Sequence, residues 1–446
     1  MSENSFIHTP AESALLERFK TLRDSLPGGE LVRAARDTAI GRFAREGLPH
    51  RRVEEWKYTD LRSFLREVAP RADRPDDAVI TGALAAARVF QDVEATHIDF
   101  VNGYLAGVGP LPDGVTAIPL AQALAEGHPL PSDVDWVAVA ENNPALMMNT
   151  AFVSEGLLIR VAAGQDVALP LHLRFVNQGD SAIATTPRVF VVVEKGASAS
   201  ILESHEGLAL TAGNTAPANQ ANTVVELVLG EDARCEHARV NAEAPGALIL
   251  SSLVVSLGAR AELHSFNLVA GAAVSRHQIF VGCKGEDVRL HLGGVTVVSG
   301  REHADTTLVV DHAVPGGESR EQFRTVVDGD ATGVFQGKII VRPDAQKTDG
   351  RMMSAALLLS EGATMNNKPE LEIWADDVQC AHGATCGELD DELLFYLMAR
   401  GLPRAEAEAL MLQAFVGEAF EMVDNEAVRD ALVFIANHRL ENRSKI

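Results

Sequence analysis

A weak repeat runs through the middle of the chain and restricts the folds that it can adopt. Each copy begins at a glycine and leads through a short polar run to a histidine, and the pairs are Gly230 and His237, Gly258 and His264, and Gly285 and His291. The glycines recur at a nearly constant interval, and the histidines recur at a constant one. A repeat of roughly 20–50 residues in a β-rich region is typical of a solenoid, in which each copy adds one coil.

The residues from about 157 onward have the alternation expected of β-strands. Every second residue is apolar in Leu169–Phe175, and a similar alternation recurs in Ile279–Cys283 and Leu371–Ala375. Short runs of this kind, broken by Gly, Asn and Asp, continue through most of the chain that follows, without a convincing helical pattern before residue 387. A β-sandwich usually contains fewer residues of strand. We therefore predict a mainly β fold whose core, residues 151–386, is a parallel β-helix.

The N-terminal region has helical patterns instead. Residues 9–12, Thr-Pro-Ala-Glu, form a capping box, and a second helix is expected from about Glu30 to Glu46. We predict a helical and mixed region over residues 1–150, within which residues 70–130 show only weak periodicity.

The C-terminal region, residues 387–446, is predicted to form three short helices. These helices carry more apolar surface than they can bury among themselves, so part of it must face the β-region or a partner. The apolar positions that we assign to partner docking are Leu393, Leu397, Leu412 and Phe420.

The formal charge excludes several classes of partner. The chain has 39 basic and 62 acidic residues, which gives a net charge of −23. Nucleic acids and anionic membranes attract clustered Lys and Arg, so we expect neither as a partner. Four cysteines in 446 residues are too few for a disulfide scaffold, and no signal peptide or membrane-spanning stretch is evident. These features predict a cytoplasmic protein with free or metal-ligating thiols.

The run Gly-Val-Phe-Gln-Gly-Lys at residues 333–338 resembles a phosphate-binding loop, but the resemblance fails in two ways. Only three residues separate its glycines, and Ile339 stands where Ser or Thr would bind Mg²⁺. The alternation of Ile339 and Val341 indicates a strand that continues. We therefore predict no ATP site in this chain.

The segment Cys380–Cys386 is the main candidate for chemistry, because Cys380, His382 and Cys386 lie close together in it. A structural zinc site or an iron–sulfur cluster normally has four ligands, so a complete site within this chain is disfavoured. A cysteine–histidine nucleophile pair is the second interpretation, because a spacing of two places Cys380 and His382 on one face of a strand. Spare thiols at a structural corner are the third.

The repeated histidines are a weaker candidate. Stacked at a constant phase on successive strands, His237, His264 and His291 would form a ladder that binds a metal ion. The simpler arrangement places them at the solvent-facing phase of those strands, and we favour it.

Four segments resemble a known family. Residues 333–350 and 368–401, the second of which reads "KPELEIWADDVQCAHGATCGELDDELLFYLMARG", closely resemble the SufB/SufD family of iron–sulfur cluster assembly proteins. "DHAVPGGES" at 311–319 fits a short turn of that family, and "GLPHRRVEEWKYTDL" at 47–61 resembles its SufD branch. Cys386 departs from the pattern, since a small or aliphatic residue is expected there.

The resemblance implies a right-handed parallel β-helix between N- and C-terminal helical regions. It also implies a non-catalytic scaffold subunit of a SufBCD complex that pairs with a SufB-like paralogue and docks a SufC-like ABC ATPase through the C-terminal helices. His382, with Cys380 beside it, would then lie at the SufB interface and contact transient iron or a nascent cluster. Cys386 is the weaker candidate, and a homodimer and a role for flavin stay open.

Two alternative functions would need other features. A polysaccharide-active β-helix enzyme would carry clustered carboxylates in a groove and would usually be exported. A free-standing metal-binding protein would use Cys380, His382 and Cys386 within one chain.

Overall fold

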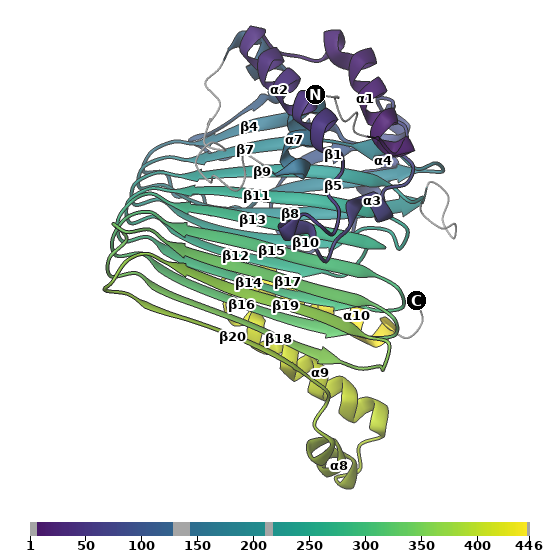
Figure 1. The fold of residues 1–446 in the computed structure, drawn as a ribbon, viewed down its shortest axis with the longest axis vertical. Helices are drawn as coiled ribbons and strands as arrows, with labels where there is room; N and C mark the ends of the chain where they lie inside the picture. The colour runs from purple at the N-terminus through teal and green to yellow at the C-terminus, as the bar shows by residue number, and fades with distance from the viewer. Residues whose placement is uncertain (1–6, 128–142, 210–216, 444–446) are drawn as a thin grey trace, which may run out of the picture.

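The computed structural model describes residues 7–127, 143–209 and 217–443, and it consists of a stack of β-coils with helices at both ends (Figure 1). All strands of the described residues belong to two ten-stranded sheets that face each other, and successive strands of the coil alternate between them. Neighbouring strands within each sheet are parallel, apart from two antiparallel pairs at the N-terminal end, which are β1 (Thr96–Val101) with β2 (Tyr104–Val108) and β3 (Val115–Pro119) with β4 (Gly156–Val161). The predicted mainly β, parallel β-helix fold with flanking helices is therefore confirmed.

The strands follow one another in a fixed spatial order. The first sheet contains, in that order, β2 (Tyr104–Val108), β1 (Thr96–Val101), β5 (Leu171–Gly179), β8 (Ser198–Ala209), β10 (Arg234–Ala242), β12 (Glu262–Val269), β14 (Arg289–Val298), β16 (Glu318–Val327), β18 (Asp349–Leu358) and β20 (Gln379–Gly387). The second contains β19 (Thr364–Ile373), β17 (Thr332–Val341), β15 (His303–His312), β13 (Val274–Cys283), β11 (Leu248–Leu257), β9 (Gln220–Leu229), β7 (Arg188–Val193), β4 (Gly156–Val161) and β3 (Val115–Pro119). A short strand, β6 (Ala184–Thr185), pairs with β9.

The interior of the coils is apolar along most of its length but contains a buried polar layer. Glu203 on β8 accepts hydrogen bonds from His205 at 2.5 Å and from Arg239 of the next coil at 3.2 Å. His237 lies 3.3 Å from the same carboxylate and 2.9 Å from the Ser265 hydroxyl. Burial alone would raise the pKa of Glu203, but the two histidines and the Arg239 charge hold it well below its ordinary value.

The constant, solvent-facing phase favoured for the three histidines is wrong for His237, which is 3% exposed. His264 and His291 are paired across β12 and β14, and their ring centroids are 4.5 Å apart. His237 instead pairs with Ser265, out of phase with the other two, and points into the interior. The reason is that the run from Gly230 to His237 contains one more position than the runs that lead to the two later histidines. Since side chains alternate along a strand, an offset of one position moves the side chain to the opposite face.

Most of the N-terminal helices cover the outer face of the second sheet near its N-terminal end (Figure 1), whereas α4 (Asp77–Ala86) packs on β1 and β5 of the first sheet. The N-terminal helices comprise α1 (Pro10–Leu22), α2 (Glu30–Glu46), α3 (Leu61–Phe64), α4, α5 (Leu120–Glu126) and α7 (Pro144–Phe152), with short 3₁₀ turns at Arg23–Ser25 and Glu54–Trp56. The capping box is confirmed, because the Thr9 hydroxyl accepts from Glu12 N–H and the Glu12 carboxylate accepts from Thr9 N–H.

Residues 47–61, here named the strap, cross four strands of the second sheet. Trp56 is 1% exposed, and the guanidinium of Arg276 on β13 lies 3.9 Å from its ring centroid. Arg276 also donates to the Glu55 carbonyl at 2.7 Å, and Thr59 donates to the Asp305 carboxylate on β15. Two further contacts reach the next strands: Gln336 on β17 donates to the Glu55 carbonyl, and Lys368 on β19 pairs with Glu54 at 2.6 Å.

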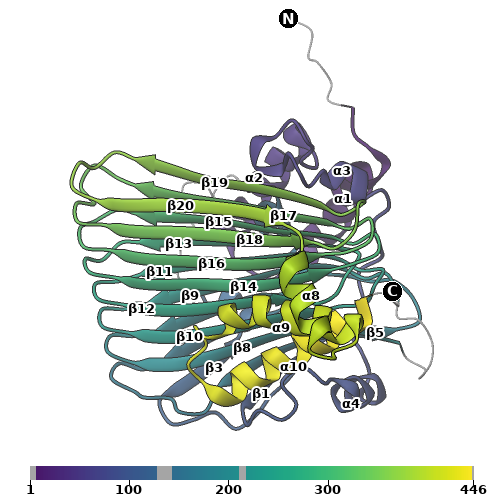
Figure 2. The same cartoon turned by 90° about the horizontal axis from the view of Figure 1, so that it is seen from below.

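The C-terminal helices are α8 (Asp391–Ala399), α9 (Arg404–Phe420) and α10 (Glu426–Asn442). Helices α9 and α10 lie across the outer face of the first sheet (Figure 2), where Leu412 and Phe420 are 0% and 2% exposed. The prediction that these two residues dock a partner is therefore wrong, because the sheet itself covers them. Among the described residues, no helix is long and apolar enough to cross a membrane.

The strap predicts a large stability effect at Trp56. Trp56→Ala should lower the free energy of unfolding by about 3–5 kcal/mol, because it leaves a cavity and removes the ring under Arg276. Urea unfolding followed by circular dichroism measures this. Trp374→Ala is the matched control, since Trp374 is 63% exposed and its loss should cost under about 0.5 kcal/mol. Equal losses for the two variants would contradict the structural role of the strap.

Candidate functional site

The C-terminal end of the β-helix is open. Strands β19 and β20 are the last of their sheets, and each has a single pairing partner within the described parts of the chain, β17 and β18 respectively. Half of the backbone N–H and C=O groups of such strands point away from the stack and can pair with another chain.

Cys380 and His382 lie on one face of β20, as their spacing predicts. They pair with Gly350 and Met352 of β18, and Met352 is part of the buried interior. The two side chains therefore project at the mouth of the coil interior, where Cys380 is half-buried and His382 is exposed. Burial raises the pKa of the Cys380 thiol, and a backbone hydrogen bond at Gly350 offsets that rise only in part. The thiol is protonated at neutral pH and would lose its proton on binding a metal ion.

Cys386 lies on the same face but far along the strand. It is exposed and pairs with Ala356, and at about 3.3 Å per residue it is roughly 13 Å from His382. Within the described residues, no group of three or more His, Cys, Asp or Glu side chains is placed to hold a metal ion. The alternative of a free-standing three-ligand site at Cys380, His382 and Cys386 is therefore wrong for a single chain.

A buried carboxyl group lies below His382 and was not found from the sequence. Glu321 on β16 pairs with Met352, which in turn pairs with His382, so the three residues form one column through the last coils. Glu321 is 2% exposed, and among the described residues neither of its carboxyl oxygens has a hydrogen-bond partner of ordinary geometry. Burial raises its pKa to about 8, and the neighbouring Ser319 hydroxyl offsets this only in part. The sequence did contain one signal for this group, because Glu321 is an acidic residue at a strand position that faces the interior.

Helix α8 carries the exposed apolar surface of the C-terminal region. It projects away from the stack of coils (Figure 1) and follows β20 after a short connection. Leu393 is 48% exposed and Leu397 is partly exposed. The partner-docking assignment left out three neighbours that are more than a third exposed, namely Phe395, Tyr396 and Met398. Asp390 caps the helix through Glu392 and Leu393 N–H, so its N-terminal end is acidic.

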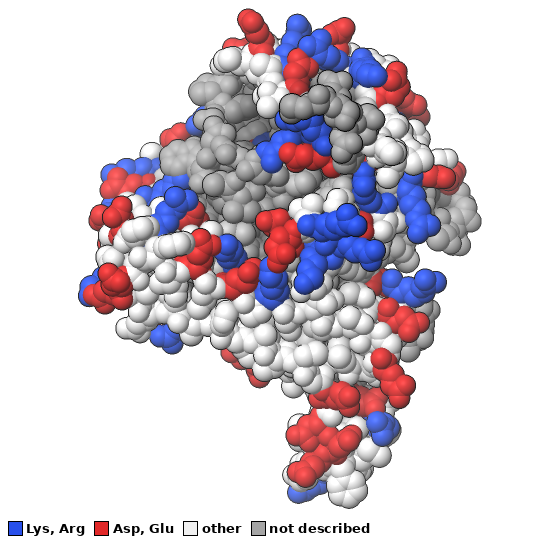
Figure 3. All heavy atoms as spheres, in the orientation of Figure 1, with Lys and Arg blue, Asp and Glu red and all other residues white. Residues whose placement is uncertain are grey.

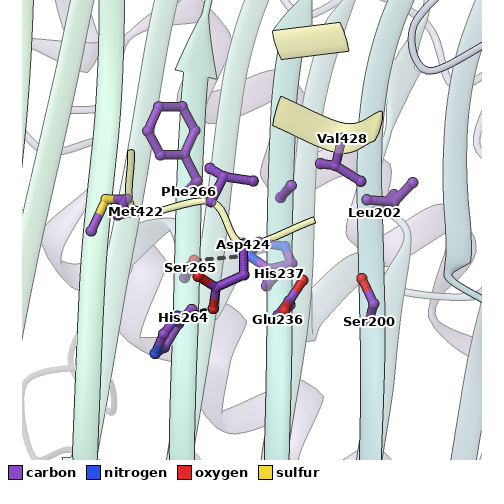
Figure 4. Close-up of a pocket in the computed structure, with 12 residues that line it drawn as sticks. Ser200, Leu202, Glu236, His237, His264, Ser265, Phe266, Met422, Asp424 and Val428 are labelled. Atoms are coloured by element: carbon purple, nitrogen blue, oxygen red, sulfur yellow. Dashed lines mark hydrogen bonds and ion pairs between the residues drawn. The ribbon is translucent and has the colours of Figure 1, made fainter. Parts of the chain in front are cut away.

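A pocket on the outer face of the first sheet lies between that sheet and the C-terminal helices. It lies where the turn between α9 and α10 crosses β8, β10 and β12 (Figure 4). Asp424 of the turn lies 3.2 Å from the His264 ring, and Met422 and Phe266 close one side. Its volume of about 20 Å³ holds one water molecule and no substrate.

The fold shows that residues 333–338, which resemble a phosphate-binding loop in sequence, do not form one. These residues lie inside β17, which is a regular strand from Thr332 to Val341 and is paired on both sides. A strand in this setting offers no loop of free N–H groups to a phosphate.

Comparisons with known proteins match the parts of the sequence that contain the four segments described above. The description "SUF system FeS cluster assembly, SufBD core domain" matches residues 175–415, and "SufBD protein N-terminal region" matches residues 11–73. A SufBD family protein of Synechocystis is 31% identical over 392 residues, which cover 84% of this chain and 84% of that protein. The iron–sulfur cluster assembly protein SufD of Escherichia coli is 28% identical over 418 residues, covering 90% and 91%. The chloroplastic protein ABCI7 of Arabidopsis thaliana is 28% identical over 446 residues, covering 93% and 88%.

Glu321 predicts a specific dependence of stability on pH. Its pKa is about 8 in the folded state against an ordinary value of 4.5, so only the folded state retains the proton between these pH values. The contribution of Glu321 to the free energy of unfolding is fully present below about pH 4.5. It is lost as the pH rises through 8, and the loss is on the order of 4 kcal/mol. Glu321→Gln should remove this loss. Urea unfolding of both proteins at pH 5 and pH 8 measures the difference.

The control for this prediction is Glu361→Gln, because Glu361 is exposed and its substitution should leave the pH dependence unchanged. A Glu321→Gln variant whose stability relative to wild type is the same at pH 5 and pH 8 would contradict the prediction.

Proposed function

Because this chain belongs to the SufBD family of iron–sulfur cluster assembly proteins, we propose that it is a SufD-like scaffold subunit of a SufBCD complex. In that complex it pairs with a SufB-like paralogue and docks a SufC-like ABC ATPase. Iron or the nascent cluster is the cargo of this assembly, and the chain itself catalyses no reaction. We expect it to act in the cytoplasm.

The open end of the β-helix is the observation that carries this proposal. It combines two unpaired strand edges with Cys380 and His382 at the mouth of the interior. Within the described residues, the cysteine and histidine donors at this mouth are Cys380 and His382, fewer than an iron–sulfur cluster usually has. A paralogue that pairs along β19 and β20 would place its own donors opposite His382 and complete the set. His382 is the stronger candidate ligand because its ring is exposed, and Cys380 stands beside it.

Helix α8 is the proposed contact with the ATPase. Its exposed apolar residues offer a small hydrophobic surface flanked by acidic side chains, which in Figure 3 appear at the lower end of the molecule. Aromatic and large aliphatic anchors of this kind dominate the energetics of protein interfaces. ATP would be bound by the partner alone, since the loop-like motif of this chain is a paired strand.

Substitutions at the open end test the cluster site. In a reconstituted complex with the SufB-like and SufC-like subunits, His382→Ala should reduce cluster formation roughly tenfold or more. Cys380→Ala should cause a partial loss, and Cys386→Ala should have little effect because it lies about 13 Å from His382. Visible absorbance with iron and sulfide content measures the product. Full activity of His382→Ala in an intact complex would overturn this assignment.

Substitutions in α8 test the docking surface. Leu393→Glu combined with Phe395→Glu should weaken binding of the ATPase subunit by about 100-fold, because it places two charges in an apolar contact. Calorimetry or co-elution measures binding. Leu31→Glu on α2 is the matched control, since Leu31 is 87% exposed and lies at the opposite end of the molecule from α8 (Figure 1). Unchanged binding of the double variant, with helical circular dichroism retained, would exclude α8 as the contact.

A further inference from the structure

The strap forms a basic hollow that none of the functions above uses. The hollow has a volume of about 320 Å³ and is lined by His50, Arg51, Arg52, Asp60 and Arg62. All but one of these side chains are basic, although the chain as a whole has a net charge of −23. Lys and Arg side chains gather on this face of the molecule (Figure 3). A concentration of positive charge against that background attracts anions.

The walls of the hollow are held in place by a buried carboxylate. Glu12 is 0% exposed, and its oxygens accept from Leu48 N–H at 2.7 Å and from Arg62 Nε at 2.8 Å. Burial would raise the pKa of Glu12, but Arg62 and the N–H groups of Thr9 and Leu48 bring it below its ordinary value. The loop between Leu48 and Arg62 is therefore fixed at both ends before any ligand arrives.

Several donors around the hollow are not committed to other groups. Arg51 and Arg52 are exposed, and neither has an ion pair within the described residues. The backbone N–H of Arg52 donates to His50 Nδ1 at 3.2 Å, so the proton of the neutral ring is on Nε2. The Asp60 carboxylate is already used, because it accepts from Ser63 N–H at the start of α3.

Some exposed arginines elsewhere on the chain are instead paired with acidic side chains. Arg260, for example, pairs with both Asp232 and Glu231, at 2.7 Å and 2.5 Å. In a chain with such an excess of carboxylates, two adjacent arginines without an acidic partner among the described residues can bind an external anion.

We propose that this hollow binds a phosphate-bearing ligand, with Arg51, Arg52 and His50 Nε2 as donors. Guanidinium groups match phosphate oxygens with two parallel hydrogen bonds, and a multivalent oxyanion can engage both arginines at once. The described lining contains no apolar side chain, so it recognises charge and oxygen geometry and offers nothing to a fatty or aromatic group. The site is separate from Cys380 and His382, which lie at the open end of the coil.

Calorimetric titration of the full chain tests this proposal. Inorganic pyrophosphate and ADP are the probes, at low and at physiological salt. Binding should be saturable, weaken at the higher salt, and fall at least tenfold in the double variant Arg51→Ser, Arg52→Ser. The matched control is Arg33→Ser with Arg45→Ser, two exposed arginines of α2 that should leave binding unchanged.

The two probes distinguish the possible sources of the phosphate. Equal affinities would assign the site to a phosphate group alone, and tighter binding of ADP would assign it to a nucleotide; both results support the proposal. No binding, or equally weak binding by wild type and both double variants, would mean an adventitious ion only and would overturn it. Circular dichroism of each variant shows that the fold is kept.

Discussion

Backbone hydrogen bonding between strands of successive coils is the interaction on which the rest of this structure depends. Each internal strand of the two sheets bonds to the strand one coil before and one coil after it, and the ladder ends at β19 and β20. The parallel ladder continues as long as coils are added, so its last members are left with unpaired groups. The residues proposed for cluster chemistry stand on β20, at the place where this regular structure stops. The proposed site therefore lies at the end of the β-helix, where the last strands have backbone groups without a partner strand.

The interior of the coils fixes how the strands are aligned. Glu203 interacts with His205 on its own strand and with His237 and Arg239 on the next coil. A slip of one residue between β8 and β10 would leave a buried charge without its partner, which costs roughly 3–5 kcal/mol. The same slip would move the apolar residues of the strand from the interior to the opposite face. The polar layer thus selects one register between these strands. The strands of later coils pair in register with them and are aligned accordingly.

The sequence was sufficient to predict the coil and part of the site, for physical reasons that also explain the failures. Alternation along the strands identified the β-helix, and a spacing of two correctly placed Cys380 and His382 on one face. Equal spacing of the histidines hid a single extra position after Gly230, so the face of His237 was assigned wrongly. Periodicity identified Leu412 and Phe420 as apolar, but it says nothing about which surface covers them. Glu321 and His382 are distant in the chain, and only the register of three strands joins them.

The strap has a consequence for the way this chain is synthesised. The Glu55 carbonyl accepts from Arg276, which is 221 residues later in the chain, and Glu54 pairs with Lys368, 314 residues later. At roughly 5–20 residues per second, the ribosome makes Arg276 about 10–40 seconds after Glu55. Throughout that interval the face of the Trp56 ring that Arg276 covers has no partner and remains available to chaperones or to aggregation. The segment that finally secures the outside of the β-helix is thus made early and can be seated only after most of the coils have been translated.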